Sequence, residues 1–99
     1  MFARLSTYQG SPVPAKGDLT ASSRSAFQQV QDLPGFRGVY YLLDRASGKA
    51  MTLSLWENED TMRGSEDRAT RIREETTRRE GQRVVSVERF EVGFSQLAP

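Results

Sequence analysis

The stretch from Phe36 to Trp56, FRGVYYLLDRASGKAMTLSLW, decides the fold of this chain. Its first part, up to Asp44, is rich in aromatic and β-branched residues, and its last part, from Ala50, is apolar at alternate positions. A short turn with Gly48 near its end separates the two parts. Two such runs joined by a short Gly-containing turn are typical of an antiparallel β-hairpin.

The segment before the hairpin predicts one strand and one helix. Residues 2–9 alternate between two faces, which indicates a strand. The apolar residues between positions 19 and 30 recur at the spacing of one helical face. This helix should end by Leu33, because the residue before Pro34 is pushed out of the helical region.

The segment after the hairpin predicts a divided helix. Asn58 is a good N-cap, and helical residues are expected from there to about Glu80. Gly64 and Ser65 should break this helix into a short and a longer piece, with Ser65 capping the second. Gly81 then supplies the C-terminal stop.

The last predicted element is a strand from Val84 to Val92. The order β-α-β-β-α-β is that of a ferredoxin-like α+β domain, in which a four-stranded antiparallel sheet carries its helices on one face. We expect this domain to span residues 1–93 and a tail to span residues 94–99.

Composition excludes several kinds of chemistry. The chain has 99 residues, no Cys and no His, so disulfides, thiolate or imidazole metal ligands and His-based catalytic dyads are absent. A net charge of +1 disfavours nucleic acid and anionic membranes as partners. With no long apolar run and no leader-like N-terminus, the chain is expected to be cytoplasmic.

The hairpin is apolar on both sides, although helices cover only one face of the predicted sheet. Met51, Leu53 and Leu55 alternate with a more polar set on the same strand. Because a large exposed apolar face is rare on a stable monomer, we expect a homodimer formed sheet to sheet. The alternative is a monomer whose tail, with Phe94 and Leu97, folds over this face.

The other side of that strand predicts a small-molecule pocket. Thr52, Ser54 and Trp56 should face the helices, and Trp56 and Phe27 would hold the helices away from the sheet. A cavity with two hydroxyl groups and an aromatic wall suits a small ligand. The alternative is that Trp56 simply fills the core and donates its N–H to a carbonyl.

Two motifs flank the hairpin turn, LPGF at 33–36 and LSLWENEDTM at 53–62. With the element order, they make the chain resemble the antibiotic biosynthesis monooxygenase family, whose members are dimeric α/β barrels. The resemblance implies a homodimer and, in one branch, oxygenation of anthrone- or quinol-like polyketide intermediates without metal or flavin. That branch implies no cofactor, and Trp56 occupies the position of its pocket Trp.

The resemblance also separates the branches of the family. The haem-degrading branch has an Asn on the first strand and a His on the second helix, whereas this chain has Ala3 and Leu5 on the strand and no His. The anthrone-oxidising branch has an Asn four residues before the Trp, where this chain has Thr52. We therefore take Trp56 and Thr52 as candidate catalytic residues.

The candidate substrate-binding residues are Ser54, Phe27, Tyr40 and Arg37. Arg37 could stabilise an enolate-like anion, and Tyr40 could present its hydroxyl. The alternative is that Arg37 faces solvent and Tyr40 is an amphipathic sheet residue.

Two other functions remain open. A non-catalytic dimeric module that binds a small ligand would keep the fold and the Trp while lacking the Asn. An RNA-recognition domain has the same element order, and residues 37–41, RGVYY, are similar to part of its signature. That segment lies on the second strand, whereas stacking aromatics should lie on the third, so RNA binding is the remote alternative.

Overall fold

The chain is described here as a computed structural model, which covers residues 1–98 apart from the side chain of Ser22. Pro99, part of the expected tail, lies outside the described residues. The elements, in chain order, are β1 (Phe2–Gln9), α1 (Ala21–Val30), β2 (Phe36–Asp44), β3 (Lys49–Trp56), α2 (Glu59–Gly64), α3 (Glu66–Glu80) and β4 (Arg83–Glu91).

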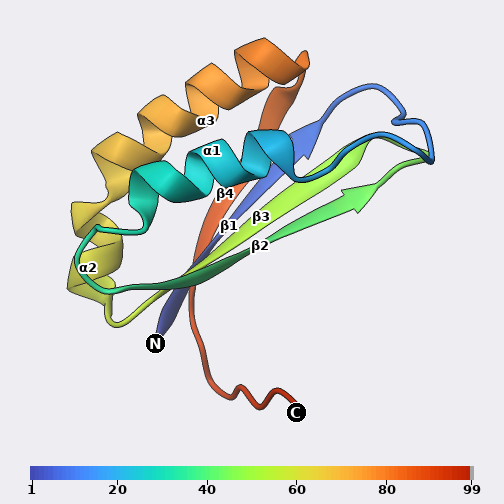
Figure 1. Cartoon of the computed structure of the whole chain (residues 1–99). Helices are drawn as coiled ribbons and strands as arrows, with labels where there is room; N and C mark the ends of the chain where they lie inside the picture. The colour runs from blue at the N-terminus through green and yellow to red at the C-terminus, as the bar shows by residue number, and fades with distance from the viewer. Residues whose placement is uncertain (99) are drawn as a thin grey trace.

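The strands form one antiparallel sheet in the order β2-β3-β1-β4. Helices α1 and α3 lie side by side over one face of this sheet, and α2 lies at the end where β3 finishes (Figure 1). The prediction of a ferredoxin-like α+β fold with a four-stranded antiparallel sheet is confirmed, with the second helix divided as expected.

The helix ends follow local chemistry. Asn58 forms a capping box with Thr61, since its side chain accepts from the Thr61 N–H and the Thr61 hydroxyl accepts from the Asn58 N–H. Gly81 ends α3 in the left-handed conformation, with φ of 67°. Ser65 separates α2 from α3, but its side chain does not cap α3. The expected cap was wrong because the Ser65 hydroxyl bonds instead to Met62 O and to Arg4.

The turn before β2 joins the two motifs that flank the hairpin turn. Gly35 has φ of 75°, and its carbonyl accepts from the Glu57 N–H at 2.7 Å. A Cβ atom at this position would overlap the side chain of Thr61. The Leu33–Phe36 turn therefore needs glycine, both for its backbone conformation and for close approach to α2.

A β-bulge near the start of β2 changes which residues share a face. Phe36 pairs with Trp56 and Gly38 with Leu55, so Arg37 is an extra residue. Phe36 consequently faces the helices together with Val39, whereas strict alternation along the strand would put Phe36 on the other side with Tyr40. A bulge inserts one residue into one strand and reverses the alternation beyond it.

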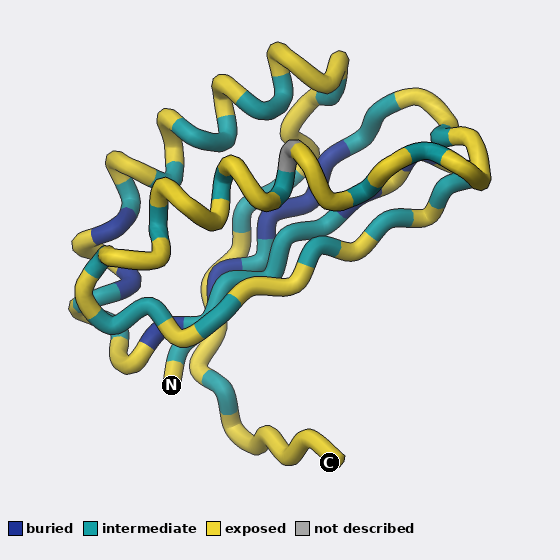
Figure 2. Tube along the Cα trace, viewed as in Figure 1, coloured by how far each residue is buried: buried dark blue, intermediate teal, exposed yellow. Residues whose placement is uncertain are grey.

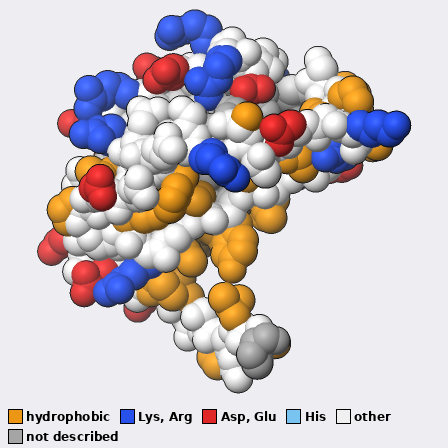
Figure 3. Space-filling model, in the orientation of Figure 1, with side chains coloured by type: hydrophobic (Ala, Val, Ile, Leu, Met, Phe, Trp, Pro, Cys, Tyr) orange, Lys and Arg blue, Asp and Glu red, His pale blue; other side chains and the backbone are white. Residues whose placement is uncertain are grey.

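The face of the sheet opposite the helices is apolar and open. Leu53 pairs with Leu5 on β1 and with Tyr40 on β2, forming a row across this open face. Figure 3 shows hydrophobic side chains along the lower side of the molecule, which is the side away from the helices. The tail runs away from the body, and its Phe94 is 83% exposed, so the tail does not fold over the open face (Figure 1).

None of the helices within residues 1–98 is long and apolar enough to span a membrane.

Candidate functional site

A cavity of about 240 Å³ lies between the sheet and the pair of helices α1 and α3. Thr52, Ser54 and Trp56 of β3 line it from the sheet side. Phe27 of α1 and Ile72 of α3 line it from the helix side. The cavity is therefore where the sequence predicted a pocket.

Small side chains on the two helices explain why this space is not filled. The cavity-facing positions of α1 include Ser23 and Ala26, and those of α3 include Ala69 and Thr76. Such short side chains leave the space between these helices and the sheet open. Well-packed interiors have few voids larger than a water molecule, so a cavity of this size is a candidate binding site.

The aromatic end of the cavity is built around Trp56. This residue ends β3 and is only 1% exposed, and its Nε1–H donates to Ser54 Oγ at 3.0 Å. The Phe36 ring meets the Trp56 ring edge to face, with centroids 5.4 Å apart, and the Phe27 ring follows at 5.9 Å from Phe36. Such stacking fixes the Trp56 ring and leaves an aromatic wall for a planar ligand.

Arg4 adds a buried positive charge beside this wall. It lies on β1 directly across from Ser54, lines the cavity and is only 3% exposed. Its guanidinium carbon lies 5.6 Å from the centre of the Trp56 ring, within the range of a cation–π contact. The burial of residues on the central strands and at the α2–α3 junction is visible in Figure 2.

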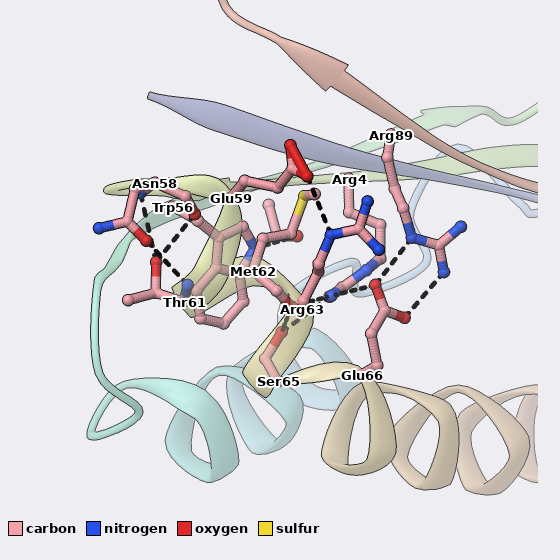
Figure 4. A network of polar contacts seen from close by, with 11 residues as sticks. Arg4, Trp56, Asn58, Glu59, Thr61, Met62, Arg63, Ser65, Glu66 and Arg89 are labelled. Carbon is pink, nitrogen blue, oxygen red and sulfur yellow. Dashed lines mark hydrogen bonds and ion pairs between the residues drawn. The ribbon is translucent and has the colours of Figure 1, made fainter.

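A polar network at the junction of α2 and α3 holds the Arg4 side chain (Figure 4). Arg4 Nη2 donates to Met62 O and Ser65 Oγ, both at 2.8 Å, and to Glu66 Oε1 at 3.0 Å. Glu66 also accepts from Arg89 of β4, from Nε at 2.7 Å and Nη2 at 2.8 Å. One carboxylate is thus shared by two guanidinium groups.

The network shifts the pKa values of its members. Hydrogen bonds from Arg89 and Arg4 outweigh partial burial and lower the pKa of Glu66 from 4.5 to about 2. Burial lowers the pKa of Arg4, and the contact with Glu66 opposes this change. Arginine remains charged at any physiological pH, so the site keeps a buried cation.

Four of the six predicted site residues lie together in the cavity: Trp56, Thr52, Ser54 and Phe27. Thr52 Oγ1 has no hydrogen-bond partner among the described residues, so its hydroxyl can serve a ligand. Trp56 Nε1–H is already used by Ser54, so Trp56 would contact a ligand through its ring.

Tyr40 and Arg37 are not brought into the cavity. Tyr40 lies on the open face and is 47% exposed, because it pairs with Leu53, whereas its neighbours Val39 and Tyr41 line the cavity. Arg37, the extra residue of the bulge, pairs with Glu57 at 3.4 Å, and both side chains are exposed.

Arg4 is the site residue that sequence reasoning missed. The cavity-facing positions of β1 are Arg4, Ser6 and Tyr8, whereas Ala3 and Leu5 point toward the open face. Ala3 and Leu5, the strand residues set against the Asn of the haem-degrading branch, therefore lie outside the cavity lining. The alternation along this strand places Arg4 on the same face as Ser6 and Tyr8, and this was the signal that could have predicted its place in the cavity.

Within the described residues, no group of three or more acidic side chains is placed to hold a metal ion.

Comparison with curated proteins finds two relatives, and no protein-family model matches the chain. The relatives are the uncharacterized proteins MT2635 and Rv2558 of two Mycobacterium tuberculosis strains. Each is 30% identical over 74 residues, which cover 75% of this chain but only 31% of the relative. The chain thus spans about a third of the length of these relatives.

Comparison with solved structures identifies the fold. A Deinococcus radiodurans protein, proposed to be an antibiotic biosynthesis monooxygenase, has a TM-score of 0.65 at 12% identity, over 100% of this chain and 99% of its own. The Streptomyces coelicolor monooxygenase from the gene ActVA-Orf6, solved with nanaomycin D, has a TM-score of 0.62 at 16% identity, over 99% and 92%. The predicted resemblance to antibiotic biosynthesis monooxygenases is therefore confirmed at the level of the fold.

Proposed function

We propose that this chain is a cofactor-independent monooxygenase acting on a small aromatic polyketide-like compound, an anthrone or a quinol. The observation that carries the proposal is the cavity of about 240 Å³ that touches Trp56, Thr52 and Ser54. Its aromatic wall suits a planar substrate, and its hydroxyl groups suit substrate oxygens. The monooxygenase structures that share this fold support the same class of reaction.

Such a reaction needs no His, metal or flavin, because the substrate supplies the electrons. An anthrone first loses a proton from its methylene carbon to water, and the resulting delocalised anion reacts with O₂. One oxygen atom becomes the new quinone carbonyl, and the other leaves as water with the two methylene hydrogens. The protein has to orient the anion, exclude water and stabilise the developing charge.

The cavity residues would divide this work. The ring system would pack against the aromatic wall that includes Trp56 and Phe27, with Trp56 fixed by its bond to Ser54. Thr52 would donate its hydroxyl to a substrate oxygen. Neither Arg37 nor Tyr40 has a part in this proposal, since both lie outside the cavity.

A non-catalytic ligand-binding module is the second candidate. Thr52 stands at the position where the anthrone-oxidising branch of the family has an Asn. A hydroxyl group does not offer the paired donor and acceptor of an amide. The Trp56 N–H, held by Ser54, is not free to assist a reaction. Both observations favour binding without turnover.

We also propose that two copies pack through their open faces. The row of Leu5, Leu53 and Tyr40 crosses this face, and Leu42 and Phe90 are nearly half exposed. An apolar face of this kind is typical of an interface, and packing it against its own copy gives an isologous dimer.

Oxygen uptake tests the proposed function. An oxygen electrode would follow the protein with anthrone and with 1,4-naphthohydroquinone, corrected for uptake without protein. We expect turnover by the wild type and a loss of at least about tenfold in Trp56→Phe and Thr52→Val, with Thr70→Val, an exposed position of α3, as the matched control. Saturable ligand binding without uptake would favour the non-catalytic module.

A further inference from the structure

One buried donor of the site has no partner. Arg4 Nε is shielded from solvent and makes no hydrogen bond within the described part of the chain, whereas Nη2 makes all the bonds of this side chain to Met62, Ser65 and Glu66. Leaving a buried donor unpaired is costly, and more so for a charged group. Because Arg4 also lines the cavity, a ligand oxygen that displaces the groups covering Nε would give this donor a partner.

Positive charge is also in excess around Arg4, which likewise favours an anionic ligand. Arg89 and Arg73 add two more guanidinium groups near Arg4, and both disfavour its charged form, while Glu66 is the carboxylate that bonds to it. Arg73 lines the cavity from α3. Arg4 thus bonds to one carboxylate, while two further cations, Arg89 and Arg73, act against its charge.

The acidic residues of the cavity wall lie at its other end. Glu80 closes α3, and at 1.5 Å per residue it is about 21 Å along the helix from Glu66. Asp18 precedes α1 and accepts from the N–H and hydroxyl of Thr20. Neither acid is placed to neutralise Arg4 and Arg73.

We propose that the ligand of this cavity carries an anionic oxygen, a carboxylate or an ionised phenol, which binds Arg4 Nε with support from Arg73 while its rings stack on Trp56. This inference rests on the proposed aromatic ligand and adds its charge and orientation. A cavity of about 150 Å³ holds benzene, so one of about 240 Å³ has room for more than a single aromatic ring. A bound anion would satisfy the Nε–H and offset the excess positive charge.

Matched two-ring probes test the inference. 2-Naphthoate carries the carboxylate, 2-naphthol titrated through its own ionisation carries the phenolate, and 2-naphthalenemethanol is neutral and of similar size. Because Trp56 is the only Trp, its fluorescence reports directly on occupancy. We expect at least one anionic probe to bind at least about tenfold more tightly than the neutral probe, and which one does so identifies the oxygen. Equal affinities, or no binding of any probe, would overturn the inference.

Substitutions test which residue binds the anionic group of the ligand. Arg4→Met should abolish the preference, measured as the ratio of the affinities for the anionic and the neutral probe, while Arg63→Met, an exposed Arg outside the cavity, should leave that ratio unchanged. If Arg4→Met does not fold, Arg73→Met should still reduce the preference severalfold. In the wild type, the Arg4 Nε–H resonance should shift on addition of the preferred anion and not of the neutral probe. An unshifted resonance would contradict the assignment to Arg4.

The outcome is independent of turnover. A preference for the anion without oxygen uptake would overturn the monooxygenase proposal and leave the inference about Arg4 in place. Oxygen uptake without a preference for the anion would support the monooxygenase proposal and overturn the inference about Arg4.

Discussion

The guanidinium carbon of Arg4 lies 5.6 Å from the centre of the Trp56 ring, and this contact joins the two halves of the site. Trp56 belongs to the aromatic wall of the cavity, and Arg4 belongs to the ionic network of Glu66 and Arg89. A cation held against an aromatic face contributes about 0.5 to 2 kcal/mol, more when water is excluded. A substitution in the ionic network should therefore also affect ligand binding in the cavity, because Arg4 contacts Trp56.

Acid should weaken the fold through Glu66. Its pKa is about 2 in the folded chain against 4.5 ordinarily, so its stabilising contribution is complete above 4.5 and is lost as the pH falls through about 2. At about 1.36 kcal/mol per pH unit, the loss is on the order of 3 kcal/mol. Denaturant unfolding at a series of pH values between 7 and 2 would measure it.

Glu66→Gln provides the comparison for that experiment. It should lower the free energy of unfolding at pH 7 by about 2 to 4 kcal/mol, because Arg4 is left as an uncompensated buried charge, and should flatten the dependence below pH 4.5. Asp67→Asn, at the exposed neighbouring position, should behave as the wild type does. An unchanged acid dependence in Glu66→Gln would contradict the role of this carboxylate.

Gly35 should tolerate no side chain. Gly35→Ala would strain a backbone with φ of 75° and press a methyl group into Thr61, so we expect a loss of at least about 1 to 3 kcal/mol in the free energy of unfolding. Gly64→Ala is the matched control, since nothing lies within 4 Å of its added carbon, and it should be neutral or stabilising. Equal effects of the two substitutions on thermal unfolding would count against this account of the turn.

Ser54 and Thr52 should differ in what they stabilise. Ser54→Ala removes the acceptor of the buried Trp56 N–H and should cost about 1 to 3 kcal/mol, with a change in the Trp56 emission spectrum. Thr52→Val removes a hydroxyl with no partner in the described chain, so it should leave stability almost unchanged while reducing turnover. A large loss of stability in Thr52→Val would show that this hydroxyl is structural.

The proposed dimer predicts a mass of twice 11.1 kDa by sedimentation at micromolar concentration. Leu53→Lys puts a charge in the middle of the apolar row between Leu5 and Tyr40 and should produce a monomer. Thr70→Lys, on the exposed side of α3, should remain dimeric. A wild-type chain that sediments as a monomer at these concentrations would refute the proposed interface.

Local signals made much of the fold predictable. The hairpin, the cap at Asn58 and the break at Gly64 depend on residues close in sequence, and so does the strand periodicity that places Thr52 and Trp56 toward the helices. For the same reason, the cavity was expected at the position where it lies.

The errors arose where distant or irregular features decide the structure. Arg4 is buried by groups about 60 residues away, at Met62 and Ser65, and no local pattern shows that an arginine within a strand will find them. The bulge at Arg37 places Phe36 on the helix side of β2, where strict alternation does not put it. A glycine inside a strand, as Gly38 is, was the one signal for that bulge.

Isotope labelling of the product tests the central claim most directly. The protein would be incubated with anthrone under ¹⁸O₂, and the quinone would be analysed by mass spectrometry at early times, with Trp56→Phe and a protein-free sample alongside. The account predicts protein-dependent quinone that carries one ¹⁸O atom, formed at a much lower rate by Trp56→Phe. Quinone formed no faster than without protein would contradict the proposed monooxygenase.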